Sequence, residues 1–156
     1  MGRDAVLAEL EGKIGQVVHV SDWITVDQER INAFAEATSD HQWIHVDAAR
    51  AQSDSPYGGT IAHGYLTLSL HPLLRDLVRV DKPVYPGVKN VINYGLNKLR
   101  FPSAVRAGSR VRGHFELVAA GAKGEDALEI TEAYTVEVEG QDRPACVAQT
   151  IMRLYF

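Results

Sequence analysis

The chain has 156 residues, of which 46% are hydrophobic and 23% charged, and its formal net charge at pH 7 is −4. This length and composition are typical of a single globular domain with a sizeable core, which we expect over residues 1–156. The acidic balance and the dispersed basic residues indicate that neither nucleic acid nor a membrane is a partner. Cys146 is the only cysteine, which excludes an internal disulfide framework and a cysteine-based zinc site. A lone cysteine and an N-terminus without the apolar run of a signal peptide favour a reducing cytoplasm.

The first half of the chain predicts one strand and two helices. Residues 17–23 read as a short strand, and Thr25 followed by Gln28 predicts a capping box for a helix that ends near Thr38. Residues 41–46 and 53–60 are expected to be loops. The stretch 61–78 predicts a buried helix that is apolar on nearly all sides, and Pro72 should bend it or remove one of its hydrogen bonds.

The second half of the chain predicts four strands, over residues 90–101, 109–120, 127–139 and 145–156. Apolar and polar residues alternate regularly in the second and third of them. The short polar segments after residues 120 and 139 suit hairpin loops. The order predicts an α+β fold in which a curved antiparallel sheet wraps around a long central helix. The exposed edges of such a sheet favour pairing into a dimer.

Ionisable residues are concentrated in one segment, residues 37–47, at the expected exit of the first helix. Asp40 and His45 are five residues apart across a turn, so both side chains could hold one water molecule. A carboxylate, which is ionised at neutral pH, and an imidazole, which titrates near neutrality, form a natural acid/base pair. The alternative is structural, with Asp40 capping the loop backbone and His45 packing beneath it. Spacing alone favours this structural alternative.

Other candidate sites are weaker. A glycine at the start of the buried helix, within residues 58–64, would expose a backbone N–H that could stabilise an oxyanion, or it would simply form a tight turn. His41, His45 and His63 are possible metal ligands, but no HExxH pattern is present and the segment after Ser39 does not look helical, so zinc is not expected. Ser39 and Ser69 lack the context of a nucleophile elbow, which argues against a serine hydrolase.

The segment around Asp40 resembles the signature of the MaoC-like dehydratases, also called (R)-specific enoyl-CoA hydratases. That signature reads Gly-Asp-x-Asn-Pro-aliphatic-His, then five residues, then Ala or Ser. The chain matches it at Asp40, Ile44, His45 and Ala51 and departs from it at Ser39, Gln42 and Trp43. Residues 60–66 (TIAHGYL) and 94–102 (YGLNKLRFP) resemble later family segments in the same order, and the resemblance covers about residues 15–156.

The resemblance implies a hot-dog fold, a homodimer with a continuous sheet, an acyl-CoA substrate, and no metal or redox cofactor. It implies catalysis by Asp40 and His45 and oxyanion binding by the backbone N–H of Gly64. It therefore favours the catalytic interpretation of Asp40 and His45 over the structural one. The buried helix with Tyr65, and the strand with Tyr94 and Leu96, would then line the acyl-binding tunnel. The departures at Gln42 and Trp43 bear on acyl-chain preference.

The expected activity is (R)-specific hydration of trans-2-enoyl-CoA, or the reverse dehydration of 3-hydroxyacyl-CoA, by an Asp/His pair that acts on water. Two alternatives stay open. A thioesterase on the same fold would attack the thioester carbonyl and release free CoA, whereas a non-catalytic acyl-thioester-binding protein would bind the substrate without turnover.

Overall fold

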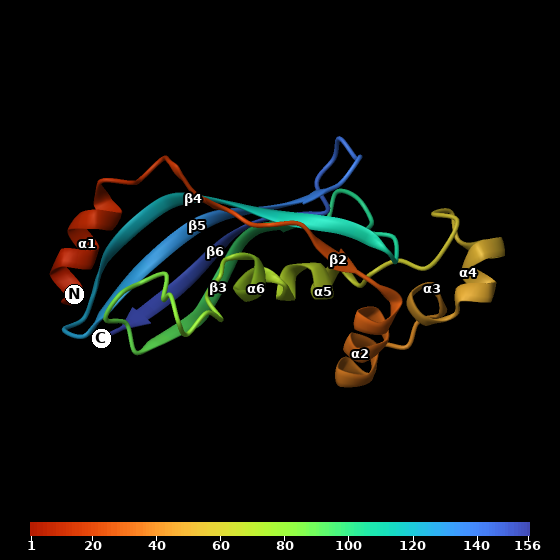
Figure 1. Cartoon of the computed structure of the whole chain (residues 1–156), viewed down its shortest axis with the longest axis horizontal. Coiled ribbons are helices and arrows are strands. Elements are labelled where there is room, and N and C mark those ends of the chain that lie inside the picture. Colours follow the sequence, from red (N-terminus) through yellow and green to blue (C-terminus); the bar gives the residue numbers. More distant parts are fainter.

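The computed structural model describes residues 1–156 and has one antiparallel sheet with short helices against one face and at both ends (Figure 1). The helices and strands in chain order are α1 (Arg3–Glu11), β1 (Val17–Val20), β2 (Ile24–Val26), α2 (Gln28–Thr38), α3 (Trp43–Val46), α4 (Ala48–Asp54), α5 (Gly64–Ser69), α6 (His71–Leu74), β3 (Asn90–Arg100), β4 (Ser109–Lys123), β5 (Ala127–Val138) and β6 (Cys146–Tyr155). The structure therefore has the α+β class predicted from the sequence. None of the helices combines the length and apolar character that crossing a membrane requires.

The sheet has the order β1-β4-β5-β6-β3, and β2 also pairs with β4. All of its pairings are antiparallel. The four predicted C-terminal strands are present close to their predicted bounds, because the alternation of apolar and polar residues specifies which face of each strand is buried. The short N-terminal strand ends at Val20, and β2, which the sequence did not predict, continues along β4. β3 is an edge strand whose residues are mostly exposed.

The central helix is shorter than predicted and consists of two segments, α5 and α6, which lie against the sheet (Figure 1). Residues 61 and 62 are extended instead, and Ala62 N–H donates to the carbonyl of Val105 at 2.7 Å. Pro72 has no N–H to donate to the carbonyl four residues earlier, and the helix is interrupted just before it, at Leu70. The helix is also less enclosed than predicted, since the side chain of Tyr65 is 68% exposed.

The connections around α2 also differ from the prediction. Residues 41–46 are not an irregular loop, because they contain the short helix α3. α2 begins with Asp27 as its N-cap, whose Oδ1 accepts from Arg30 N–H at 2.8 Å, so the predicted capping box of Thr25 and Gln28 is wrong. α1 was not predicted at all; it buries Val6 and Leu10 against the far end of the sheet.

A buried ion pair holds the end of the central helix on the sheet. The guanidinium of Arg75, just after α6, donates from Nε and Nη2 to the carboxylate of Glu132 in β5 at 2.9–3.0 Å, and the Glu132 side chain is fully buried. Tyr85 O–H donates to Glu132 Oε1 at 3.0 Å. Burial raises the pKa of Tyr85, which keeps its phenol protonated and able to donate. Glu132 lies on the apolar face of β5, where the guanidinium of Arg75 compensates its negative charge.

We predict that Glu132→Gln strongly destabilises the fold, because it leaves the Arg75 guanidinium buried without a counter-charge. Removing one partner of a buried pair typically costs about 3–5 kcal/mol in the free energy of unfolding, measured here by urea denaturation. The double variant Arg75→Met/Glu132→Leu is the control and should lose much less, since it buries no charge. A loss below about 1 kcal/mol for Glu132→Gln would contradict a structural role for the pair.

Candidate active site

α2 and α3 lie together at one end of the sheet (Figure 1). Asp40 lies between them in the chain, and His45 belongs to α3. α2 ends at Ser39, which adopts a left-handed conformation (φ 61°) and turns the chain sharply before Asp40. His45 follows on the single turn of α3. One ring nitrogen of His45, one of His63 and one carboxylate oxygen of Asp40 lie within 4.8 Å of one another. The structure thus brings the two predicted acid/base residues together and adds a third residue to them.

The imidazole of His45 is held in one orientation by a backbone carbonyl. Its Nδ1 lies 2.7 Å from the carbonyl oxygen of Ile61, so Nδ1 carries the proton and donates, which leaves a lone pair on Nε2. Burial lowers the pKa of His45, and His63 lowers it further, while the bond to Ile61 and the charge of Asp40 oppose that change. His45 is therefore mainly neutral at pH 7 and can accept a proton at Nε2.

Gln28 links the His45 segment to the segment before α5. Its Nε2 donates to the carbonyl of His45 at 2.8 Å, and its Oε1 accepts from the hydroxyl of Thr60. Ile61 N–H donates to the carbonyl of Ile44 at 3.1 Å alongside this bridge. No local pattern in the sequence predicts this role of Gln28, because the contact joins residues 17 apart in the chain.

His63 packs between Phe34 and the catalytic candidates. Its ring centroid is 3.8 Å from that of His45 in a stacked arrangement and 4.9 Å from that of Phe34. Its Nε2 lies 3.0 Å from the backbone oxygen of Asp40 and 4.0 Å from Asp40 Oδ2. The side chain of His63 is 3% exposed, whereas that of Asp40 is about half exposed. The water that the pair would hold can therefore reach the Asp40 side.

Of the three histidines considered as zinc ligands from the sequence, only His45 and His63 lie together in the structure. His41 is exposed and faces Glu36, with its Nδ1 3.6 Å from Glu36 Oε1, and is not part of the cluster. The rings of His45 and His63 are nearly parallel, and the lone pair of a ring nitrogen lies in the plane of its ring. The lone pairs of the two rings therefore point side by side and do not converge on one point. This geometry fits poorly with both rings binding a single ion.

Gly64 begins α5 directly after His63, and its N–H has no acceptor among the protein atoms. A Cβ at this position would lie 3.1 Å from the ring of Phe101, so no larger residue fits without displacing that ring. Gly64, Ile61 and Phe101 line an open cleft of about 510 Å³. The N–H predicted to stabilise an oxyanion therefore lies beside a cleft and next to the acid/base cluster in the chain.

The predicted acyl-binding residues are distributed over two places. Tyr65 packs edge-on against Phe101, whose ring lines the cleft beside Gly64. Tyr94 and Leu96 lie on β3 and line a separate cleft of about 430 Å³ with Leu68 of α5. Within one chain, the structure does not bring Tyr94 and Leu96 into the cleft of Gly64.

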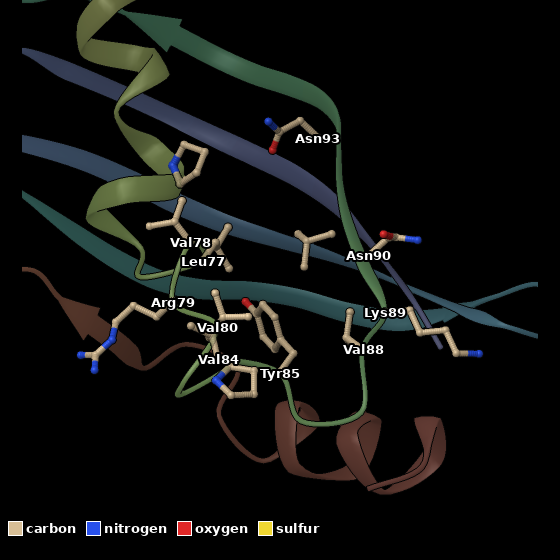
Figure 2. Close-up of a pocket in the computed structure, with 13 residues that line it drawn as sticks. Leu77, Val78, Arg79, Val80, Val84, Tyr85, Val88, Lys89, Asn90 and Asn93 are labelled. Carbon is tan, nitrogen blue, oxygen red and sulfur yellow. The ribbon is translucent and has the colours of Figure 1, made fainter. Parts of the chain in front are cut away.

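A third cleft, of about 560 Å³, lies between residues 77–89 and the start of β3 (Figure 2). It adjoins the cleft of Tyr94 through Pro72 and Asn93, which line both. Its walls are largely apolar, with Leu77, Val84 and Val88 among the lining residues. None of its lining residues belongs to the Asp40, His45 and His63 cluster.

Comparison with known proteins identifies the family. The family model described as "MaoC like domain" matches residues 9–140. The chain belongs to this family. It is 50% identical over 147 residues to 3-hydroxyacyl-thioester dehydratase Z of Mycobacterium tuberculosis, with 94% of each chain covered. It is 46% identical over 153 residues to nodulation protein N of Rhizobium leguminosarum bv. viciae, with 96% of this chain and 91% of the relative covered.

Solved structures confirm the predicted hot-dog fold. The R-hydratase PhaJ1 from Pseudomonas aeruginosa superimposes with a TM-score of 0.70 at 23% identity, over 94% of this chain and 83% of its own. The (R)-hydratase from A. caviae gives a TM-score of 0.65 at 22% identity, over 88% of this chain and 95% of its own. This MaoC-like chain is an enzyme of the hydratase/dehydratase class, as the sequence predicted.

We predict that His45 titrates below its ordinary pKa of 6.5 in the folded protein, because burial disfavours its protonated form. The imidazole shifts of His45 in an NMR pH titration measure this directly. In urea, where the site is lost, the midpoint should return to about 6.5. A midpoint at or above 6.5 in the folded protein would contradict the buried, neutral state of the ring.

Proposed function

We propose that the chain adds water to trans-2-enoyl thioesters to give (R)-3-hydroxyacyl thioesters, and catalyses the reverse dehydration, with Asp40 and His45 acting on one water molecule. The observation that carries the proposal is the fixed tautomer of His45. Its Nδ1 bond to the Ile61 carbonyl leaves Nε2 as a proton acceptor, and a ring nitrogen of His45 lies within 4.8 Å of an Asp40 carboxylate oxygen. A neutral base beside a carboxylate is what activating a water molecule at neutral pH requires.

In the hydration direction, the water oxygen attacks C3 of the enoyl thioester while one member of the pair accepts its proton. The electrons of the C2–C3 double bond move toward the thioester, giving an enolate. A proton from the same pair then adds to C2 on the same face, so the overall reaction adds one water. We assign the acid and base roles to Asp40 and His45 jointly, because both residues act on the same water molecule.

The developing enolate oxygen needs a hydrogen-bond donor that is already in place. We propose that Gly64 N–H supplies it, because this donor has no protein acceptor and lies beside an open cleft. A preorganised donor at a forming oxyanion contributes about 3–4 kcal/mol to lowering a barrier. The close approach of the Phe101 ring explains why the position takes glycine.

For the substrate we propose an acyl-CoA. The 50% identical relative is named as a dehydratase of 3-hydroxyacyl thioesters, which fits a thioester substrate. Tyr65 would contact the substrate near Gly64, and Tyr94 and Leu96 would bind the acyl chain. The proposed chemistry is acid/base only and needs neither a metal nor a redox cofactor, and the proposed location is the cytoplasm.

We propose that two copies pair through β3 into a homodimer with a continuous sheet. β3 is an unpaired edge of 11 residues on which Ile92, Tyr94 and Leu96 are each at least 45% exposed. Such an edge, with apolar side chains, is a template for pairing. Dimerisation would also enclose the cleft that Tyr94 and Leu96 line, which is open in one chain.

The dimer makes a direct prediction. Sedimentation velocity at micromolar concentration should give a species of twice the monomer mass, because pairing buries the apolar edge of β3. Ile92→Lys should shift the population toward the monomer, since it places a charge in that interface. A wild-type protein that sediments as a monomer would contradict pairing through β3.

The activity is tested with crotonyl-CoA, whose enoyl absorbance should fall as water adds. Asp40→Asn and His45→Gln should each lower kcat at least about a hundred-fold with little change in KM, because each removes a group that exchanges a proton in the transition state. The double variant should be scarcely slower than either single one, since the two residues act on one water.

His41→Gln is the control, because His41 is exposed and lies outside the cluster, and it should keep most of the activity. Prolonged chelation should leave turnover intact. Near wild-type rates from folded Asp40 and His45 variants would contradict their assignment. Release of free thiol from crotonyl-CoA would favour the thioesterase, and binding without turnover would favour an acyl-thioester-binding protein.

A further inference from the structure

His63 makes contacts that packing alone does not explain. It is almost fully buried at the start of α5, where an apolar side chain would fill the space beside Phe34 without burying polar atoms. Its Nδ1 is buried and has no hydrogen-bond partner. A buried polar atom without a partner costs stability, so the contacts of the rest of the His63 ring need an explanation beyond filling space.

The ring nitrogens of His63 have different surroundings, and these fix its tautomer. Nε2 lies 3.0 Å from the backbone oxygen of Asp40, which can only accept, so Nε2 carries the proton. Nδ1 is then the unprotonated nitrogen, and lacking a partner is less costly for an acceptor than for a buried N–H. His63 therefore donates to the main chain of Asp40 at the sharp turn that follows α2.

The face of the same ring supports the second catalytic candidate. The His45 ring stacks on His63 at 3.8 Å between centroids with 26° between the planes. The His45 ring is also held by the bond from its Nδ1 to the carbonyl of Ile61. The ionisable groups that face His45 are His63, from the start of α5, and Asp40, from the loop after α2. The side chain of His63 thus contacts both members of the pair.

We propose that His63 is a positioning residue, which holds the main chain of Asp40 through Nε2–H and the imidazole plane of His45 through stacking. The inference rests on the proposed hydration by Asp40 and His45. Small displacements of groups that must reach one water molecule reduce the rate strongly, because the reacting atoms have to be aligned. His63 itself has no contact with the substrate in this mechanism, so its loss should act on turnover and not on binding.

Two variants separate the contributions of its two contacts. His63→Phe keeps a flat ring against His45 but has no donor for the Asp40 carbonyl, and we expect kcat to fall about ten- to a hundred-fold with KM nearly unchanged. His63→Gln keeps an N–H near the position of Nε2 but loses the stacking face, so it should recover part of the activity lost in His63→Phe. Partial rescue by a donor distinguishes positioning from simple packing.

His19→Phe is a matched control. His19, in β1, also has a buried ring nitrogen without a partner, and it is not part of the catalytic cluster. Its replacement should leave kcat within about two-fold of wild type, as for substitutions that do not touch reacting groups. A similar loss in His19→Phe and His63→Phe would show that removing any such histidine slows the enzyme, which would overturn the positioning role.

The tautomer gives a readout that does not depend on activity. Long-range ¹H–¹⁵N NMR at pH 7 should show His63 with a proton on Nε2 and none on Nδ1, and His45 with the reverse. His63 protonated on Nδ1, or a folded His63→Phe with wild-type kcat while Asp40→Asn is inactive, would overturn this inference alone. If His63→Phe fails to fold, the kcat of His63→Gln and the tautomer of His63 test the positioning role instead. A wild-type enzyme that does not hydrate crotonyl-CoA would instead refute the proposed function.

Discussion

The hydrogen bond between His45 Nδ1 and the carbonyl of Ile61 joins two parts of the chain that must cooperate. It sets the tautomer of the imidazole, and it ties α3 to the extended segment that leads into α5. Gln28 reinforces the same junction by binding the His45 carbonyl and the Thr60 hydroxyl. Because Gly64 follows this segment by a few residues, the bond that orients the proposed base also places the proposed oxyanion donor relative to it.

The rest of the fold holds this junction in place relative to the sheet. α5 buries Leu66 against the concave face of the sheet, and α6 buries Leu74 in the same core. Just beyond α6, the buried ion pair of Arg75 with Glu132 attaches the end of the helix to β5. The two helical segments are thus fixed at their C-terminal end by charge and along their length by apolar packing. Their N-terminal end, at Gly64, lines an open cleft.

The sequence predicted the sheet well, and the local helical structure less well. β4 and β5 follow from alternation, since β5 buries every second residue from Leu128 to Val138 and β4 does so from Val111 to Leu117. α1 was missed because only two of its residues, Val6 and Leu10, are buried, and their partners lie far along the chain in the sheet. The single turn of α3 is too short to leave a periodic pattern. The central helix was predicted too long because Ile61 and Ala62 pair with residues near Val105, a contact that no local pattern encodes.

The residues of the candidate site also differ in whether a local sequence pattern predicts them or whether their contacts join distant parts of the chain. Asp40 and His45 were found through a motif resemblance, whereas their spacing alone favoured a structural interpretation. His63 was noticed only as a possible metal ligand, because its contacts with Asp40 and His45 span 23 and 18 residues. Tyr94 and Leu96 lie on the exposed edge strand β3, so their proposed role in binding the acyl chain depends on the proposed second copy of the chain.

The claim that one pair of side chains works on one water molecule has a stereochemical consequence. Hydration of crotonyl-CoA in D₂O should place one deuterium at C2 and the new hydroxyl at C3 on the same face of the former double bond. Proton NMR coupling constants of the 3-hydroxybutyryl product distinguish this from addition to opposite faces. A product of same-face addition with (R) configuration at C3 is the expected result. Addition to opposite faces, or a mixture of both, would contradict the action of Asp40 and His45 from a single side of the substrate.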